Sequence, residues 1–207
     1  HITDEIKSRV KQLGHTGEYD FIITEIGGVV GDIESLPFLE AVRQLRWELG
    51  RDSLCIHLTY VPYIAAAKEL KTKPTQHSVK QLQELGIQPD ILVLRTEKEI
   101  TPEVRRKIAL FCNVLPEDVV QSIDVPSIYQ VPVKMHEQHL DDIVLRLTDT
   151  TSKGEPEMGP WLSFLGKMTE AEKPVTIGLV GKYVELQDAY KSIDEALFQA
   201  ATYAGRK

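Results

Sequence analysis

FIITEIGGVVGDIESLPF, residues Phe21–Phe38, is the most informative stretch of this sequence. An apolar run leads to Glu25, three glycines follow at positions 27, 28 and 31, and Pro37 then opens a helical pattern. A strand that ends in an acid and a Gly-rich turn lets the backbone approach a bulky ligand and presents a hard oxygen ligand suited to Mg²⁺. An ordinary βα turn with solvated acids explains the same spacing about equally well, because short glycine patterns are common.

Apolar runs and helical patterns alternate along the first 147 residues. The strand candidates are continuous apolar runs, which indicates burial on both faces. Alternation of this kind predicts an α/β fold in which helices flank a parallel sheet, with right-handed crossovers. The expected strands are residues 20–24, 53–61 and 90–94, and the expected helices are residues 2–13, 37–49, 74–85, 101–111 and 136–147.

Ligands of parallel sheets bind beyond the carboxyl ends of the strands. We therefore expect Glu25, the loop after Val61 and the segment after Leu94 to meet at one edge of the sheet. The loop after Val61 contains Lys71–Gln76, which combines two ammonium groups, two hydroxyls and an amide at the start of a helix. Such a helix end attracts anions, although in an arbitrary protein a plain basic loop is the commoner explanation.

The composition limits the classes of partner. A formal net charge of −7 argues against nucleic-acid polymers and anionic membranes. Local lysine and arginine clusters, at residues 68–80 and 105–107, fit a small polyphosphate instead. No apolar run reaches the roughly 20 residues that span a bilayer, no signal peptide is visible, and Cys55 and Cys112 form no CxxC pair. A reduced cytoplasmic setting is the simplest interpretation.

The pattern changes after residue 147. Residues 148–160 are rich in Thr, Gly, Glu and Pro and predict a linker. A new strand is expected at residues 175–183 and a new helix at residues 188–204. Because a lone strand and helix cannot bury a core, this part is expected to be the beginning of a second domain. The chain opens on His1 and stops soon after a helix, so we expect a fragment of a longer protein.

Three motifs carry a resemblance to a known family: the Gly-rich stretch, residues 71–78 (KTKPTQHS) and residues 87–90 (IQPD). The chain closely resembles CTP synthases over essentially its whole length. The resemblance implies that residues 1–147 are the C-terminal part of an incomplete amidoligase domain, P-loop NTPase-like and related to dethiobiotin synthetase. It implies an interdomain linker at 148–173 and the first strand and helix of a class I glutamine amidotransferase domain at 174–207.

The resemblance also implies roles for individual residues, position by position. Glu25 corresponds to a magnesium ligand. Asp32, Ile33 and Glu34 correspond to residues that bind the inhibitor CTP. UTP and CTP would be bound by Lys71, Thr72, Lys73, Pro74, Thr75, Gln76 and Lys107, and the adenine of ATP by Ile123, Asp124 and Val125.

The implied reaction makes CTP from UTP, ATP and glutamine through UTP phosphorylated on its 4-oxygen, with Mg²⁺ as cofactor and a cytoplasmic homotetramer as the full-length enzyme. No catalytic residue is expected within these 207 residues, so we expect the chain alone to form no CTP. Two alternatives stay open. The chain could belong to another dethiobiotin-synthetase-like ATPase, or it could be a non-catalytic module for CTP sensing and assembly.

Several other residues invite a chemical role but are interpreted as structural. His136 and His139 have metal-ligand spacing without a third ligand, so they are expected to be solvated. His57 is expected to be a satisfied strand residue. Both cysteines are expected to be buried structural thiols, and Trp47 and Trp161 are expected to pack against neighbours.

Overall fold

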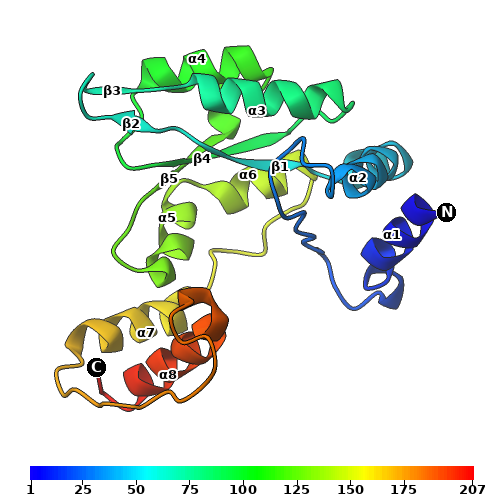
Figure 1. The fold of residues 1–207 in the computed structure, drawn as a ribbon. Coiled ribbons are helices and arrows are strands. Elements are labelled where there is room, and N and C mark those ends of the chain that lie inside the picture. The colour runs from blue at the N-terminus through cyan, green and yellow to red at the C-terminus, as the bar shows by residue number, and fades with distance from the viewer. The chain divides into compact units, whose positions relative to one another are not determined.

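A parallel sheet organises residues 1–152 (Figure 1). Its strands β1 (Ile56–Tyr60), β4 (Ile91–Thr96) and β5 (Val119–Ile123) lie in the order β1-β4-β5. Ile56 pairs with Ile91, and Leu92 pairs with Val119. The α/β class and the parallel sheet flanked by helices are thereby confirmed.

The computed structural model describes residues 1–207, except for the side chain of Gln187. The chain forms two compact units, residues 1–152 and residues 153–207, and each is described by itself.

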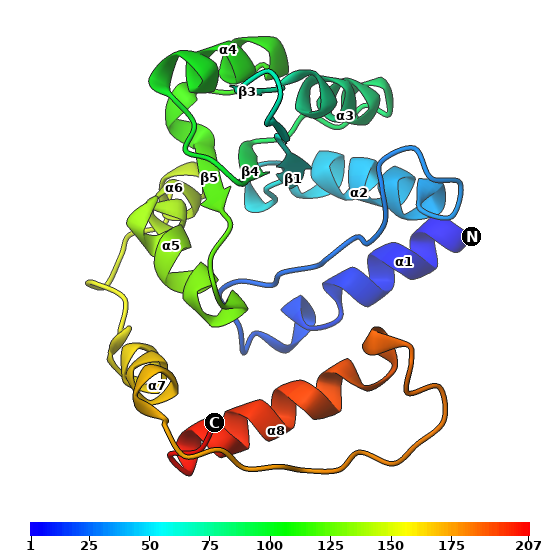
Figure 2. The same cartoon turned by 60° about the vertical axis from the view of Figure 1, so that its left-hand side comes forward.

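Helices flank both faces of the central strand β4 (Figures 1 and 2), whereas Ile56, Leu58 and Tyr60 leave one side of the edge strand β1 exposed. Helices α3 (Lys73–Glu84) and α4 (Pro102–Cys112) lie on one face, and α5 (Val131–Glu137) and α6 (Leu140–Leu147) lie on the other. Strand β4 is apolar on both sides, since Leu92 and Leu94 face the first helix pair while Ile91 and Val93 face the second. Alternate side chains of a strand point to opposite faces, so a central strand buried on both sides must be continuously apolar.

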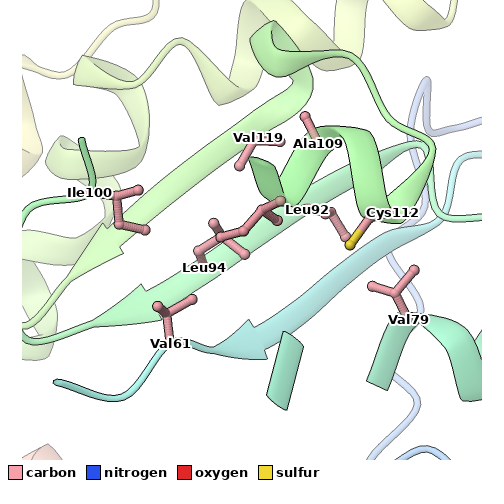
Figure 3. Packing of buried hydrophobic residues seen from close by; sticks show 9 residues of the cluster. Val61, Val79, Leu92, Leu94, Ile100, Ala109, Cys112 and Val119 are labelled. Atoms are coloured by element: carbon pink, nitrogen blue, oxygen red, sulfur yellow. The ribbon is translucent and has the colours of Figure 1, made fainter. Parts of the chain in front are cut away.

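The larger core cluster lies between the sheet and helices α3 and α4 (Figure 3). Leu92 and Leu94 of β4 meet Ala109 and Cys112 of α4, and Val79 contributes from α3. These side chains are almost completely buried. Burying a large aliphatic side chain contributes about 1.5–3 kcal/mol, so this layer fixes α3 and α4 on the sheet.

Local signals explain where these two helices begin and end. Pro74 and Pro102 occupy first-turn positions, where a missing N–H costs nothing. Thr101 caps α4 by accepting a hydrogen bond from the backbone N–H of Val104 at 3.4 Å. Gly86 follows α3 with φ of +80°, a conformation that favours glycine. The predicted helices 74–85 and 101–111 are confirmed to within two residues.

Helix α1 (Ile2–Lys11) packs on α2 (Leu36–Leu49), and Glu48 accepts from Lys7 at 2.6 Å and from Lys11 at 3.0 Å. A short antiparallel hairpin, β2 (Tyr63–Ile64) and β3 (Glu69–Leu70), joins β1 to α3. The 3₁₀ turns of this unit are η1 (Gly14–Thr16), η2 (Gly50–Asp52), η3 (Pro116–Asp118) and η4 (Ile128–Gln130).

The predicted strand at residues 20–24 is wrong for this structure. Residues 21–27 have no regular secondary structure, and the side chain of Ile23 is 95% exposed. A strand needs a ladder partner for its backbone groups, and among the described residues the ladder partner of β1 is β4. The apolar run therefore stays extended but unpaired.

Three further details differ from the sequence-based expectations. Strand β5 and the β2–β3 hairpin were not predicted. The expected helix 136–147 is split into α5 and α6 at His139, whose φ is +58°. Trp47, expected to pack, is 88% exposed on α2.

The second unit contains a pair of helices, α7 (Gly159–Glu170) and α8 (Lys191–Tyr203), with the 3₁₀ turn η5 (Gln187–Tyr190) before α8. Phe164 lies between Trp161 and Tyr203, with ring centroids 5.8 and 5.6 Å away. Packing of Trp161 is therefore as expected. Helix α7 falls inside the segment 148–173 that was predicted as a linker.

The predicted helix 188–204 corresponds to η5 and α8. The predicted strand 175–183 does not form in the described backbone, where the nearby pairing is a single parallel bridge between Lys173 and Arg206. The assignment of this part to a second domain stays a prediction. In the described residues, no helix is both long enough and apolar enough to cross a membrane.

Candidate functional site

The Gly-rich stretch forms a tight turn before α2. Gly28 and Gly31 have φ of +88° and +103°, which a residue with a side chain adopts only with strain. Asp32 closes the turn, because its backbone N–H donates to Val29 O at 3.0 Å and its Oδ2 accepts from the Val29 N–H at 3.0 Å. One carboxylate oxygen of Asp32 is therefore engaged in a hydrogen bond within its own loop.

This turn encloses a pocket of about 460 Å³. Of the predicted site residues, the structure brings Glu25, Asp32 and Glu34 together in its wall, whereas Ile33 is 79% exposed and lies outside the lining. Among the described side chains, no hydrogen-bond partner of the Glu25 carboxylate is found, and that residue is exposed. The lining residues are Glu25, Ile26, Gly27, Gly28, Asp32, Glu34, Ser35 and Phe38.

The position of this pocket in the fold differs from the expectation. Ile26 and Val30 pack on the cluster that contains Leu82 of α3 and Ile87, and a side chain added to Gly31 would meet Gln81. These contacts lie at the C-terminal half of α3, next to the amino ends of the strands. The expectation that Glu25 shares the carboxyl edge with the other candidate segments is therefore wrong. The apolar side chains of an unpaired segment settle where buried apolar surface is available.

The lysine-rich segment does lie at the carboxyl edge, at the N-terminus of α3. Thr75 is fully buried there, and its hydroxyl lies 3.0 Å from Thr59 Oγ1 and 3.2 Å from Tyr60 O. Thr72 is also buried, and its Oγ1 accepts from Gln76 Nε2 at 3.2 Å. The Thr75 hydroxyl therefore joins the start of α3 to β1, and the Thr72 hydroxyl bonds within the helix itself, while Lys71, Lys73 and Pro74 are exposed.

Glu69 links two of the predicted ligand residues. Its carboxylate forms an ion pair with Lys71, and the pKa of Glu69 is lowered by this hydrogen bond, by the charge of Lys71 and also by the charge of Lys107. The charge of Lys107 on α4 thus reaches Glu69 as the smallest of these effects, which sequence separation did not indicate. The sequence analysis did not single out Glu69. An acid two residues before Lys71 could have indicated it, because side chains two apart in an extended segment point to the same side.

The third candidate segment also follows the carboxyl end of a strand. Ile123 ends β5, and the backbone N–H of Asp124 donates to Thr96 O at 2.9 Å. Arg95 Nε lies 3.3 Å from Asp124 Oδ1. Val125, the last of this group, is half-buried. Residues 123–125 and the lysine cluster therefore share the carboxyl edge, and the Gly-rich pocket lies toward the far end of α3, whose twelve residues span about 18 Å.

Both cysteines are at least half-buried, and His57, His136 and His139 each contact a polar side chain. Burial raises the pKa of Cys55 and of Cys112 to about 11, which suits inert thiols, and Cys112 is buried as expected whereas Cys55 is only half-buried. His57 Nε2 lies 2.9 Å from Ser78 Oγ, so His57 is a satisfied strand residue. His136 and His139 each contact an aspartate, at 2.9 and 3.0 Å. Among the described residues no group of three or more His, Cys, Asp or Glu side chains could hold a metal ion.

The fold defines a class: a parallel-sheet α/β protein with exposed lysines at the start of α3, at the carboxyl edge of the sheet. Comparison with known proteins makes the class specific. Residues 1–149 match the family model described as CTP synthase N-terminus. The chain belongs to the CTP synthase family.

Individual relatives agree. The chain is 67% identical over all 207 residues to a CTP synthase of Porphyromonas gingivalis, of which it covers 38%. It is 62% identical over the same length to one of Bacteroides fragilis, covering 39% of that protein. Over 201 residues, 97% of the chain, it is 61% identical to one of Cytophaga hutchinsonii, covering 37%. The chain thus spans well under half the length of these curated relatives.

Proposed function

We propose that the chain acts as part of a CTP synthase that converts UTP to CTP with ATP and with ammonia released from glutamine. ATP would phosphorylate the 4-oxygen of the uracil ring. Ammonia would then attack carbon 4, which bears that oxygen, and phosphate would leave. The single observation that carries this proposal is the 67% identity to a protein named CTP synthase along the whole chain. The exposed lysines Lys71 and Lys73 at the N-terminus of α3 support it independently of the comparison.

Lys71, Lys73 and Lys107 are the groups we propose for the triphosphate of UTP or CTP. All three are exposed, so their ammonium groups can reach a ligand without unpacking the core. The N-terminus of α3 adds unpaired backbone N–H groups and the positive end of the helix dipole. Thr72 and Thr75, implied as contacts by the resemblance, would act chiefly by holding this helix end in place, because both are buried.

Glu25 is the proposed magnesium ligand. An exposed carboxylate in a pocket wall fits this role, since Mg²⁺ keeps several waters and takes only one or two protein carboxylates beside phosphate oxygens. Bound there, the ion would neutralise charge that develops in phosphoryl transfer. Glu34 and the free oxygen of Asp32 would accept hydrogen bonds from the amino group of CTP, which UTP lacks.

The two candidate regions lie at opposite ends of α3 within one chain. A site that needs both regions would therefore combine the Gly-rich pocket of one subunit with the lysine cluster of another. The homotetramer proposed for the full-length enzyme offers such a subunit boundary. Ile123, Asp124 and Val125 would contact the adenine of ATP, residues 174–207 would begin the glutaminase domain, and the setting would be cytoplasmic.

Nucleotide binding tests this proposal directly. Isothermal titration of the chain with UTP should show binding that weakens at least about tenfold in Lys71→Ala or Lys107→Ala, since each removes a charge-assisted contact worth about 1.5–3 kcal/mol. Lys80→Ala, an exposed lysine further along α3, is the matched control and should bind as the parent does. Equal weakening in all three variants would contradict a specific triphosphate site.

Activity is expected to need more than these residues. The chain mixed with UTP, ATP, Mg²⁺ and ammonia should yield no CTP, and measurable turnover would refute that expectation. Tighter binding of diamino acids than of UTP would favour another dethiobiotin-synthetase-like ATPase. CTP binding that depends on neither Glu25 nor Mg²⁺ would favour a sensing and assembly module.

A further inference from the structure

Glu69 occupies an unexpected place for an acid. It lies on the β2–β3 hairpin at the carboxyl edge of the sheet, in direct contact with a lysine proposed to hold the triphosphate. A carboxylate beside a polyphosphate site weakens binding in two ways. It competes with the phosphates for the lysine, and its negative charge repels them. Its presence therefore calls for an explanation beyond the proposed contacts.

The hairpin fixes where this carboxylate lies. Glu69 pairs with Ile64 across the hairpin, Tyr63 pairs with Leu70, and the backbone N–H of Lys71 donates to Pro62 O at 2.9 Å. Hydrogen bonds at Leu70 and Lys71 thus fix the backbone that carries both side chains of the pair. The ion pair itself is half exposed, with side-chain exposures of 53% and 47%. An exposed pair of this kind is weak and easily exchanged for another partner.

We infer that Glu69 sets the affinity of the lysine cluster by acting as an internal competitor: its carboxylate occupies Lys71 in the free protein and is displaced by the phosphates of the incoming ligand. This inference rests on the proposed function, because it concerns the same lysines. The ion pair holds the Lys71 side chain beside the hairpin without nucleotide, at the expense of tighter binding.

The test is a titration of the chain with two probes, UTP and inorganic tripolyphosphate, at constant low ionic strength. In Glu69→Gln the dissociation constant for both probes should fall about twofold to fivefold, the range that an exposed ion pair allows. Glu69→Asp keeps the charge and should stay within about twofold of the parent. Because salt screens exposed charges, the gain of Glu69→Gln should shrink at high ionic strength.

Glu84→Gln is the matched control. It removes another exposed carboxylate, 4.0 Å from Lys80 at the C-terminal end of α3, and should leave both dissociation constants unchanged. The thermal midpoint of Glu69→Gln should equal that of the parent, because the backbone pairs of the hairpin remain. Unchanged or weaker binding in Glu69→Gln would overturn the inference, as would an equal gain in Glu84→Gln.

The two probes separate this inference from the proposed function. If tripolyphosphate binds with the expected Glu69 dependence while UTP does not bind, the competitor role stands and the proposed function fails. If UTP binds normally and Glu69→Gln changes nothing, the proposed function stands and the competitor role fails. If neither probe binds the parent chain, both are overturned.

Discussion

Arg46 and Asp90 form a two-pronged ion pair that joins helix α2 to the amino edge of the sheet. Arg46 Nη1 lies 2.7 Å from Asp90 Oδ2, and Arg46 Nη2 lies 3.2 Å from Oδ1. Asp90 Oδ2 also accepts from the backbone N–H of Cys55 at 2.7 Å, just before β1. One carboxylate thereby connects α2, β1 and β4, because Asp90 immediately precedes β4.

This junction should be worth measurable stability. Asp90→Ala removes the acceptor of both a guanidinium and a half-buried N–H, so the free energy of unfolding in urea should fall by about 2 kcal/mol. Glu40→Gln is the control, since it breaks the exposed Glu40–Arg43 pair on the same helix and should change the midpoint little. Equal midpoints for both variants would show that Asp90 does not hold the junction.

The Thr59–Thr75 pair offers a test of what Thr75 does. Thr75→Val keeps the side-chain shape but leaves the buried Thr59 hydroxyl without this partner, so unfolding should become easier by about 1–2 kcal/mol. The double variant Thr59→Val/Thr75→Val should be less destabilised than the sum of the single changes, because no lone hydroxyl remains. Additive losses in a urea-melt cycle would contradict a coupled pair.

His57 should make the stability depend on pH. Burial lowers its pKa below the usual value, so on acidification the unfolded chain takes up a proton near pH 6.5 before the folded chain does. The unfolded state then binds more protons, and the free energy of unfolding must fall as the pH drops from 7 toward 5. Urea melts of His57→Gln should show a shallower fall than the parent. His77→Gln, an exposed control on α3, should keep the parental slope.

Both thiols should react slowly in the folded chain. With a pKa of about 11, each is only about one-thousandth thiolate at pH 8. Labelling with a disulfide reagent at pH 8 should therefore be slow without urea and fast in unfolding urea, where the pKa returns to about 8.5. Cys55→Ser and Cys112→Ser assign the signals. Rapid labelling of either thiol in the folded chain would contradict its burial.

Local signals predicted the helices well, because they depend on neighbours in sequence. Proline in the first turn and Gly86 after α3 set boundaries that the structure reproduces. Strand β5 was not predicted, because Val119–Ile123 is short and its two polar residues interrupt the apolar pattern. The break between α5 and α6 at His139 was not predicted either, since a non-glycine residue at positive φ has no strong sequence signature.

The candidate site was predictable only in part. Glu25, Asp32 and Glu34 line one pocket because all three lie within ten residues of one another around one tight turn, which their closeness in the sequence already indicated. The sequence could not show that the charge of Lys107 reaches Glu69, since the hairpin and α4 approach each other only when packed on the sheet. The predicted roles of these residues await the binding measurements.

Periodicity, capping and motifs, all read locally, were enough to predict the α/β class, the ends of α3 and α4 and the family. The tertiary structure alone decided which edge of the sheet each motif reaches. The Gly-rich turn lies by the amino ends, since the segment before it has no ladder partner among the described residues, and Ile26 and Val30 of the turn pack on α2 and α3. Long-range packing, which no local pattern encodes, sets that choice.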